Sequence, residues 1–185
     1  MRLIVGISGA TGTIYGIRIL EELNRLGVET HVVISDMGGR NIELETEYSV
    51  KSVEGLATEV HNICNLAASI SSGSFHTDGM IIAPCSMKSL SAIANSFNTN
   101  LLIRAADVVL KEKRKLVMVV RETPLHMGHL RLMTMVAENG GILLPPMPAF
   151  YNHPKTMDDL INQTVGKVLD QFHVEHDLFN RWAGA

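Results

Sequence analysis

Five apolar runs lie at intervals along the chain, and each ends where small or polar residues begin. They occupy residues 3–7, 28–34, 79–83, 116–120 and 142–144. Most of them lack a polar face, which is typical of strands buried on both sides of a parallel sheet. The runs therefore predict five strands of such a sheet.

Apolar residues at helical spacing fill the intervals between these strands. The first such pattern follows the first strand and includes Ile14, Ile17, Leu20 and Leu23. Similar patterns predict helices near residues 100–110 and 125–139 and from Thr156 onward. Ser86 has the position and chemistry of an N-cap, which indicates a further helix directly after the third strand.

The interval between the second and third strands is less regular. Gly38-Gly39 predicts a loop, residues 40–47 a short acidic helix or turn, and residues 53–60 a helical run. Residues 49–75 as a whole predict a long, partly ordered excursion of the kind that is often functional. The alternation of strands and helices predicts an α/β fold: a three-layer, doubly wound parallel sheet of the Rossmann-like kind, as one domain over residues 1–185.

The first strand runs directly into the glycine-rich turn Ser8-Gly9-Ala10-Thr11-Gly12, and a helix follows. Small residues let backbone N–H groups approach a phosphate, and the positive end of the helix dipole points at it. The turn therefore predicts a phosphorylated ligand, such as a nucleotide.

Ligands of doubly wound sheets bind beyond the carboxyl ends of the strands. That rule selects the glycine turn, Ser35-Asp36, residues 85–88, Arg121-Glu122 and the loop through Tyr151. We expect these segments to converge in space although they are far apart in the sequence. Opposite charges directly after a buried strand, as at Arg121-Glu122, suit a phosphate clamp and a proton-transfer group.

Composition and charge limit the ligands and the cellular environment that we expect for this chain. The 185 residues carry 16 lysines and arginines against 19 acidic residues, a net charge of −3, which gives no reason to expect nucleic acid. The two cysteines imply no disulfide framework and fit a reducing cytoplasm. The apolar runs are too short for a signal peptide or a membrane span.

A short-chain dehydrogenase is one rival interpretation of the glycine turn. Asp36 stands where a ribose-binding acid would, and Tyr151 and Lys155 have the Tyr-x-x-x-Lys spacing of those enzymes. That spacing brings the two side chains together only on a helix. Pro154 disfavours a helix there, so the dehydrogenase interpretation is the weaker one.

Other candidate motifs have simpler structural explanations. Asp158-Asp159 resembles a metal-dependent prenyl-transfer motif, but two acids also suit the first turn of a helix. Cys85 lacks an obvious activating histidine and is expected to pack at a strand end. The histidines show no ligand spacing beyond His126 and His129, three apart on a helix, so we expect no metal site.

The chain resembles the UbiX-type flavin prenyltransferases over almost its whole length, and within them the branch that accompanies phenolic (hydroxyarylic) acid decarboxylases. The resemblance rests on separate motifs in the correct order: Gly9-Ala-Thr-Gly12, Ile42-Glu-Leu-Glu-Thr46, Ser71-Ser-Gly-Ser-Phe75, Pro84-Cys-Ser-Met-Lys88, Arg104-Ala-Ala-Asp-Val-Val-Leu-Lys-Glu112, Arg121-Glu-Thr-Pro124, Pro145-Pro-Met-Pro-Ala-Phe-Tyr151 and Arg181-Trp182.

The resemblance implies a metal-independent enzyme that joins dimethylallyl phosphate to reduced FMN at N5 and C6. The product, prenylated FMN, would serve a partner UbiD-type hydroxyarylic-acid decarboxylase. The resemblance also implies a cytoplasmic homo-oligomer, usually a dodecamer, with sites at the interfaces between copies. Two alternatives stay open: an FMN-dependent decarboxylase that acts directly on a carboxylate, and a non-catalytic flavin carrier that accompanies a phenolic-acid decarboxylase.

The same resemblance implies roles for individual residues. The FMN-binding set would be Gly9, Ala10, Thr11, Ser35, Ser86, Met87, Lys88 and Arg121. Lys111, Tyr151 and Lys167 would bind the phosphate of dimethylallyl phosphate. Glu45 and Glu122 are similar to the family's proton-handling acids, and Trp182 matches an aromatic residue near the isoprenoid.

The sequence departs from the family pattern at several positions. Thr11 replaces a serine and keeps the hydroxyl, and Lys88 replaces a threonine of the ubiquinone branch. The segment 126–133 lacks the usual Glu-Asn after His-Leu. The tail beyond Trp182 is short, which puts closure of the site by that segment in doubt.

Overall fold

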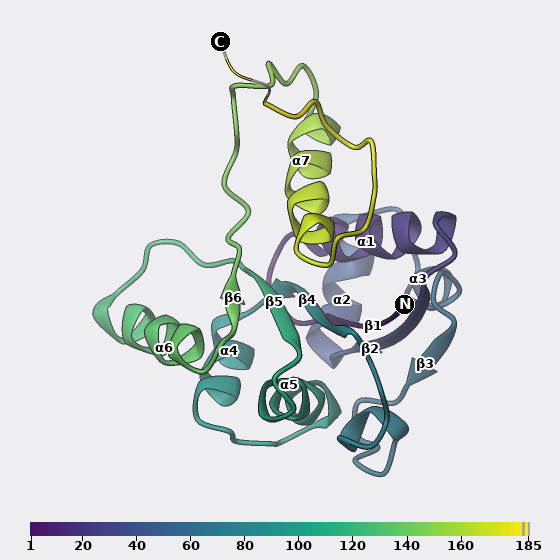
Figure 1. Cartoon of the computed structure of the whole chain (residues 1–185), viewed down its shortest axis with the longest axis vertical. Coiled ribbons are helices and arrows are strands. Elements are labelled where there is room, and N and C mark those ends of the chain that lie inside the picture. The colour runs from purple at the N-terminus through teal and green to yellow at the C-terminus, as the bar shows by residue number, and fades with distance from the viewer. Residues whose placement is uncertain (183, 185) are drawn as a thin grey trace.

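Six parallel strands form one sheet in the computed structural model, which describes residues 1–182 and 184 (Figure 1). The strands are β1 (Arg2–Ile7), β2 (Glu29–Ile34), β3 (Glu59–His61), β4 (Gly79–Cys85), β5 (Lys115–Val120) and β6 (Ile142–Leu143). Their order in the sheet is β3-β2-β1-β4-β5-β6. The chain moves outward from β1 to one edge and then returns to build the other half. The order therefore reverses between β1 and β4, where ligands of such sheets bind.

Within the described residues, seven α-helices and one 3-10 helix connect the strands. They are α1 (Thr13–Arg25), α2 (Asp36–Glu45), α3 (Val50–Glu54), η1 (Ser69–Ser71), α4 (Met87–Ala94), α5 (Leu101–Lys111), α6 (Met127–Glu138) and α7 (Met157–Asp170). Figure 1 shows α1 and α7 on one side of the sheet and α4 and α5 on the other. The three-layer architecture predicted from the sequence is confirmed.

The two faces of the sheet support two separate apolar cores. Leu3, Val5 and Ile7 of β1 pack with α1 and α7, whereas Ile4 points to the core beneath α4 and α5. Successive side chains of a strand alternate between the faces, so a strand covered on both faces is apolar throughout. This explains why the strands are detectable as continuous apolar runs.

The predicted loop at Gly38-Gly39 is wrong, because both glycines lie inside α2. Ser35 caps this helix by accepting a hydrogen bond from the Gly38 N–H. A Cβ on Gly38 would lie 2.5 Å from the Ile7 carbonyl oxygen. Glycine is therefore present because α2 packs closely on the end of β1, not because the chain turns there.

The helical run predicted for residues 53–60 is also wrong beyond Glu54. Helix α3 ends at Glu54, and Glu59–His61 form the edge strand β3. Three residues are too few to give a periodic pattern, and pairing with β2 from His31 to Val33 fixes the strand instead.

Gly16 lies where α1 crosses β4. A Cβ at this position would be 2.2 Å from the Ala83 carbonyl oxygen, so only glycine lets the helix approach the strand so closely. Within the described residues, no helix combines the length and the apolar character needed to cross a membrane.

Candidate functional site

A cavity of about 290 Å³ opens at the carboxyl ends of β1, β2 and β4. Its walls are Gly9, Ser35, Asp36, Met37, Ile63, Cys64, Ser86, Lys88, Ser89 and Asn100. Four of the residues expected to bind FMN therefore line one cavity, although they come from three different strand ends. The cavity lies beside the point where the strand order reverses, as the fold predicts.

Two helices direct their N-termini toward this cavity. Ser35 is the N-cap of α2, and Ser86 is the N-cap of α4, where its Oγ accepts a hydrogen bond from the Ser89 N–H at 3.2 Å. The N-cap predicted at Ser86 is confirmed. The first backbone N–H groups of both helices carry partial positive charge, so this side of the cavity favours an anionic ligand.

A buried serine joins the ends of β1 and β4 behind the cavity. The Ser8 hydroxyl donates to the Pro84 carbonyl at 2.9 Å and accepts from the Ser86 N–H at 2.8 Å. Ser8 is 1% exposed, so both bonds are protected from water. The hydroxyl thereby fixes Ser86 relative to the glycine turn, a role that the sequence did not indicate.

The glycine turn approaches α2 closely at its first glycine. A Cβ on Gly9 would lie 2.5 Å from the Met37 Cβ. Gly12 is the N-cap of α1 with φ of 95°, a left-handed conformation that suits glycine, and its missing side chain leaves the helix uncapped locally.

Glu45, at the end of α2, caps α1 from outside. Its Oε2 accepts hydrogen bonds from the Gly12 N–H at 2.8 Å and from the Thr13 N–H at 3.2 Å. Partial burial raises the pKa of Glu45, but the bonds from Gly12, the Thr11 hydroxyl and Thr13 outweigh burial and hold this pKa below its ordinary value. A carboxylate thus occupies the N-terminus that the sequence suggested for a phosphate, whereas the N-termini of α2 and α4 face the cavity.

Asn41 completes the contact between α2 and the glycine turn. Its Nδ2 donates to the Ala10 carbonyl at 3.1 Å. Asn41 and Glu45 are four residues apart and so lie on one face of α2. The sequence predicts a short acidic helix or turn over residues 40–47, and in a helix this spacing places both side chains on one face. Their partner on the glycine turn is visible only in three dimensions.

Met87 and Cys85 flank Ser86, and both side chains point into the core. Met87 is 9% exposed and Cys85 is fully buried. Burial raises the pKa of the Cys85 thiol to about 12, so a thiolate nucleophile is disfavoured there. The packing role predicted for Cys85 is confirmed. Met87 can offer the cavity its backbone N–H in the first turn of α4, while its side chain serves the core.

Arg121 and Glu122 follow β5 directly and are exposed. The Arg121 N–H donates to the Cys85 carbonyl at 3.1 Å, which ties this segment to the end of β4. The Glu122 carboxylate accepts a hydrogen bond from the Thr123 N–H at 3.1 Å. Both charged residues therefore lie at the carboxyl ends of the strands, as the cavity does and as the sequence predicted.

Lys111 lies at the opposite side of the sheet, near the amino-terminal ends of the strands. It is the last residue of α5, shortly before β5 begins at Lys115, and its ammonium pairs with Glu112. Arg121 follows the opposite end of β5. A six-residue strand spans roughly 20 Å, so Lys111 and Arg121 of one chain are held apart.

The remaining predicted residues gather around α7 and the C-terminal tail. The segment between β6 and α7 extends away from the sheet (Figure 1), and Trp182 of the C-terminal tail lies near it. The rings of Tyr151 and Trp182 meet edge to face with centroids 6.0 Å apart. Lys167 and Arg181 both pair with Asp170, at 3.6 and 2.7 Å. The Arg181 guanidinium outweighs the opposing effect of burial and holds the pKa of Asp170 below its ordinary value.

The structure also distinguishes between the rival interpretations of these sequence motifs. Residues 151–155 form a turn and an extended segment, so Tyr151 and Lys155 do not share a helix face. Asp159 forms a capping box with Thr156 at the start of α7. His126 caps α6 through its Nδ1, which accepts from the Gly128 N–H at 3.0 Å.

Comparisons with known proteins agree with this geometry. The Flavoprotein family model matches residues 1–168. Flavin prenyltransferase UbiX from Thauera aromatica is 67% identical over 184 residues, spanning 100% of this chain and 95% of that protein. A dodecameric FMN-dependent UbiX-like decarboxylase from Escherichia coli O157:H7 superposes with a TM-score of 0.98 at 52% identity over 100% of both chains. AnUbiX (PadA1), solved in complex with FMN and dimethylallyl pyrophosphate, has a TM-score of 0.98 at 49% identity, covering 100% of this chain and 98% of that one.

Proposed function

This chain belongs to the UbiX family of flavin prenyltransferases, and on that basis we propose that it joins a dimethylallyl group to reduced FMN at N5 and C6. The observation that carries the proposal is the cavity at the sheet reversal, which gathers Gly9, Ser35, Ser86 and Lys88 from three strand ends. In this proposal residues 1–185 act as a single flavin-binding domain.

The cavity fits a mononucleotide in its chemistry. The close contact of Gly9 with Met37 admits no side chain, so Gly9 contributes only backbone to the cavity wall. Ser35 and Ser86 bring hydroxyls and helix N-termini, and Lys88 adds an exposed ammonium in the first turn of α4. Together with Ala10, Thr11, Met87 and Arg121, these residues would hold FMN. Bound reduced FMN supplies the nucleophilic nitrogen and carbon of the reaction.

Departure of phosphate from the allylic carbon requires fixed positive charge. Negative charge grows on the leaving phosphate, and cations placed around it stabilise that charge without a metal. Arg121 stands at the cavity edge of β5, and Lys111, Lys167 and the Tyr151 hydroxyl complete the phosphate-binding set in this proposal. The aromatic face of Trp182 suits the positive charge that develops on the allyl group.

Ring formation on the flavin releases a proton, which needs a positioned base. Glu122 is exposed at the end of β5, beside Arg121, and we assign the proton to this carboxylate. Glu45 is ionised at neutral pH like an ordinary glutamate, and its lowered pKa keeps it ionised further into acid. It can accept a proton but not donate one there, and its primary role is to hold Gly12 and Thr13 in place.

A complete site requires more than one copy of the chain. Lys111 and Arg121 lie at opposite ends of β5, so one phosphate cannot touch both within a chain. Neighbouring copies can bring them together. Apolar side chains that are exposed in a single chain favour such packing: Met127, Leu130, Met135, Phe150 and Trp182. We propose a homo-oligomer, and specifically a dodecamer, the assembly named for the E. coli O157:H7 relative.

The product would pass to a partner UbiD-type decarboxylase of hydroxyarylic acids, in the cytoplasm. Cys64 is exposed and Cys85 is buried, and both are free thiols, which suits a reducing compartment. The partner remains a proposal that rests on family membership. Its test is whether the flavin product restores activity to a UbiD-type apoprotein.

Mass spectrometry of the flavin tests the main proposal. The purified protein is incubated without oxygen with reduced FMN and dimethylallyl phosphate, and in parallel with the pyrophosphate. We expect the flavin to gain one dimethylallyl unit, and Glu122→Gln to bind FMN without forming the adduct. Glu175→Gln, an exposed acid in the C-terminal tail, is the matched control. An unchanged flavin mass in the wild type overturns the proposal.

Direct decarboxylation is the second candidate, because the E. coli O157:H7 relative is described as a decarboxylase. The same protein, loaded with FMN but without a prenyl donor, is offered hydroxyarylic and aliphatic carboxylic acids. Release of carbon dioxide in turnover amounts would establish this alternative. A flavin that stays unmodified together with no release of carbon dioxide would leave a non-catalytic flavin carrier.

A further inference from the structure

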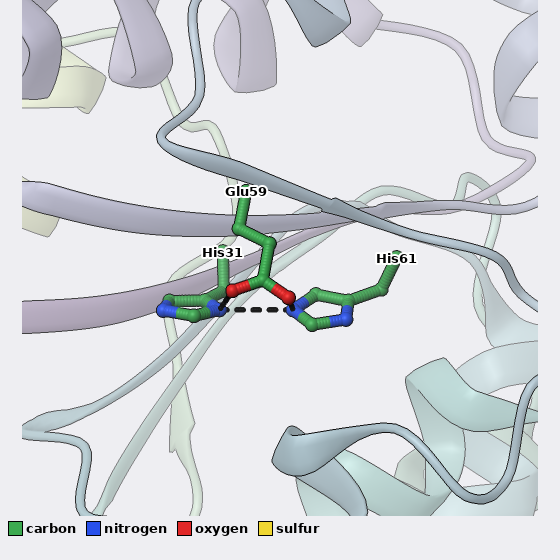
Figure 2. A group of neighbouring side chains, drawn as sticks. All are labelled: His31, Glu59 and His61. Carbon is green, nitrogen blue, oxygen red and sulfur yellow. Dashed lines mark hydrogen bonds and ion pairs between the residues drawn. The ribbon is translucent and has the colours of Figure 1, made fainter.

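Two buried histidines and a glutamate come together on β2 and β3, and none of the three is among the residues that line the cavity. Figure 2 shows His31, Glu59 and His61 with their polar atoms directed toward one another. His31 is opposite Glu59 in the register of the two strands, and His61 follows Glu59 by two residues. All three side chains therefore leave the same face of the sheet.

The distances within this cluster suit a metal ion. His31 Nδ1 is 2.9 Å from His61 Nε2 and 3.4 Å from Glu59 Oε2, and His61 Nε2 is 3.7 Å from Glu59 Oε1. Ligands that bind tetrahedral zinc at about 2.0–2.1 Å lie about 3.4 Å from one another. Shifts of a few tenths of an ångström would place all three atoms around one ion.

A second carboxylate fixes the orientation of His31. Glu29 Oε1 lies 3.2 Å from His31 Nε2, and because a carboxylate only accepts, Nε2 carries the hydrogen. In the tautomer whose only ring hydrogen is on Nε2, His31 presents a bare Nδ1 to Glu59 and His61. Metal-binding histidines commonly show this carboxylate–imidazole pair. Phe75 packs its ring edge to face against His31 with centroids 5.1 Å apart, which restrains the imidazole further.

In that tautomer the His31 Nδ1 and the Glu59 carboxylate direct lone pairs toward the point that His61 Nε2 also faces. His61 Nε2–H can donate to His31 Nδ1, but Glu59 Oε2 still faces the same bare nitrogen at 3.4 Å. The two acceptors repel each other across that gap. A cation at the centre would turn the repulsion into three favourable contacts, and His61 would then carry its hydrogen on Nδ1.

Charge and access also suit a divalent cation. Glu29 and Glu59 supply two negative charges, and Arg2 offsets one of them through its 2.6 Å contact with Glu29. The imidazoles are nearly buried, at 2% and 7% exposure, whereas the Glu59 side chain is 54% exposed. An ion can therefore enter past Glu59 at the open edge of the sheet.

We propose that His31, Glu59 and His61 form a binding site for a divalent transition-metal ion, with zinc as the favoured ion and Glu29 as the supporting carboxylate. Two imidazoles and one carboxylate are ligands that zinc prefers. The ion would link β2 to the three-residue edge strand β3. Ile63 and Cys64, which follow that strand, line the cavity, so the site would fix one wall of it.

Metal titration of the whole protein tests this site. Protein without a histidine tag is freed of metal with a chelator and titrated with zinc chloride by calorimetry, and with Co²⁺ by visible absorption. We expect one ion per chain and the absorption bands of four-coordinate Co²⁺. His61→Gln should weaken zinc binding by about 100-fold or more, and Glu29→Gln by about 10-fold or more.

Two further variants separate the loss of a metal ligand from a general loss of structure. Glu59→Gln changes an exposed side chain, so it should preserve the fold and still weaken binding at least about 10-fold. His173→Asn is the matched control, because His173 is exposed, lies outside the cluster and has a φ of 56° that asparagine tolerates. It should bind zinc like the wild type. The proposal is overturned if the wild type binds no stoichiometric ion, or if Glu59→Gln and Glu29→Gln bind zinc unchanged. A protonated His31 held between the carboxylates would then explain the cluster.

Discussion

The carboxylate of Glu45 lies 2.8 Å from the backbone nitrogen of Gly12 and so closes the N-terminus of α1 from a different helix. Gly12 has no side chain to cap α1, and the four N-terminal N–H groups of a helix need partners. Glu45 supplies one with a full negative charge, which the helix dipole favours. The glycine turn is thus held in place by α2.

Removal of this cap should destabilise the protein. Glu45→Ala is expected to lower the free energy of unfolding by about 1 kcal/mol, the usual cost of a lost N-cap. It should also weaken FMN binding, because Gly9 and Ala10 belong to the same turn. Urea unfolding followed by circular dichroism and a flavin fluorescence titration measure the two effects. Glu43→Ala, an exposed neighbour on α2, should change neither of them.

The contribution of Glu45 should depend on pH in a defined direction. Its pKa is lowered in the folded protein, so its stabilisation is complete above the ordinary glutamate pKa of about 4.3. It is lost as the pH falls through the lower folded value. The stability difference between wild type and Glu45→Gln should therefore be constant near neutral pH and vanish in acid. A difference that grows as the pH falls would contradict the assigned hydrogen bonds.

The two adjacent glycines of α2 should differ in their tolerance of alanine. A Cβ on Gly38 would meet the Ile7 carbonyl oxygen at 2.5 Å, whereas a Cβ on Gly39 would meet the Val50 Cγ2 at 3.3 Å. Gly38→Ala should cost about 1–3 kcal/mol of unfolding free energy, because backbone must move. Gly39→Ala should be close to neutral, since a methyl group can shift and alanine favours helix by about 1 kcal/mol. Thermal unfolding of both variants makes the comparison, and equal melting temperatures would refute it.

The two thiols should differ in reactivity. Cys64 is exposed at the cavity, whereas Cys85 is buried with a pKa of about 12. One equivalent of a maleimide should therefore react with the native protein, and two with the denatured protein. Bound FMN should slow the reaction of Cys64, because both occupy the same cavity. Cys64→Ser supplies the control, and a native Cys64→Ser protein that still reacts would contradict the burial of Cys85.

The apolar pattern of the sequence determined the sheet because its strands are covered on both faces. Continuous apolar runs such as 116–120 have no other stable location, and alternation with helices required parallel pairing. The same rule identified Ser35, Ser86 and Arg121 as strand-end residues. Short or close-packed features escaped this pattern. Strand β3 has three residues, and the glycines of α2 resemble a loop until the Ile7 carbonyl beside them is known.

Only the tertiary structure decided which polar groups meet. Asn41 and Glu45 reach the glycine turn because α2 crosses it, and His31 meets His61 because β2 and β3 pair in one register. Lys111 and Arg121 are close in the sequence but lie at opposite ends of β5. The periodicity of apolar residues indicates which face of a helix or strand a residue occupies. The partner across space depends on how separate elements pack, and local periodicity carries no record of that packing.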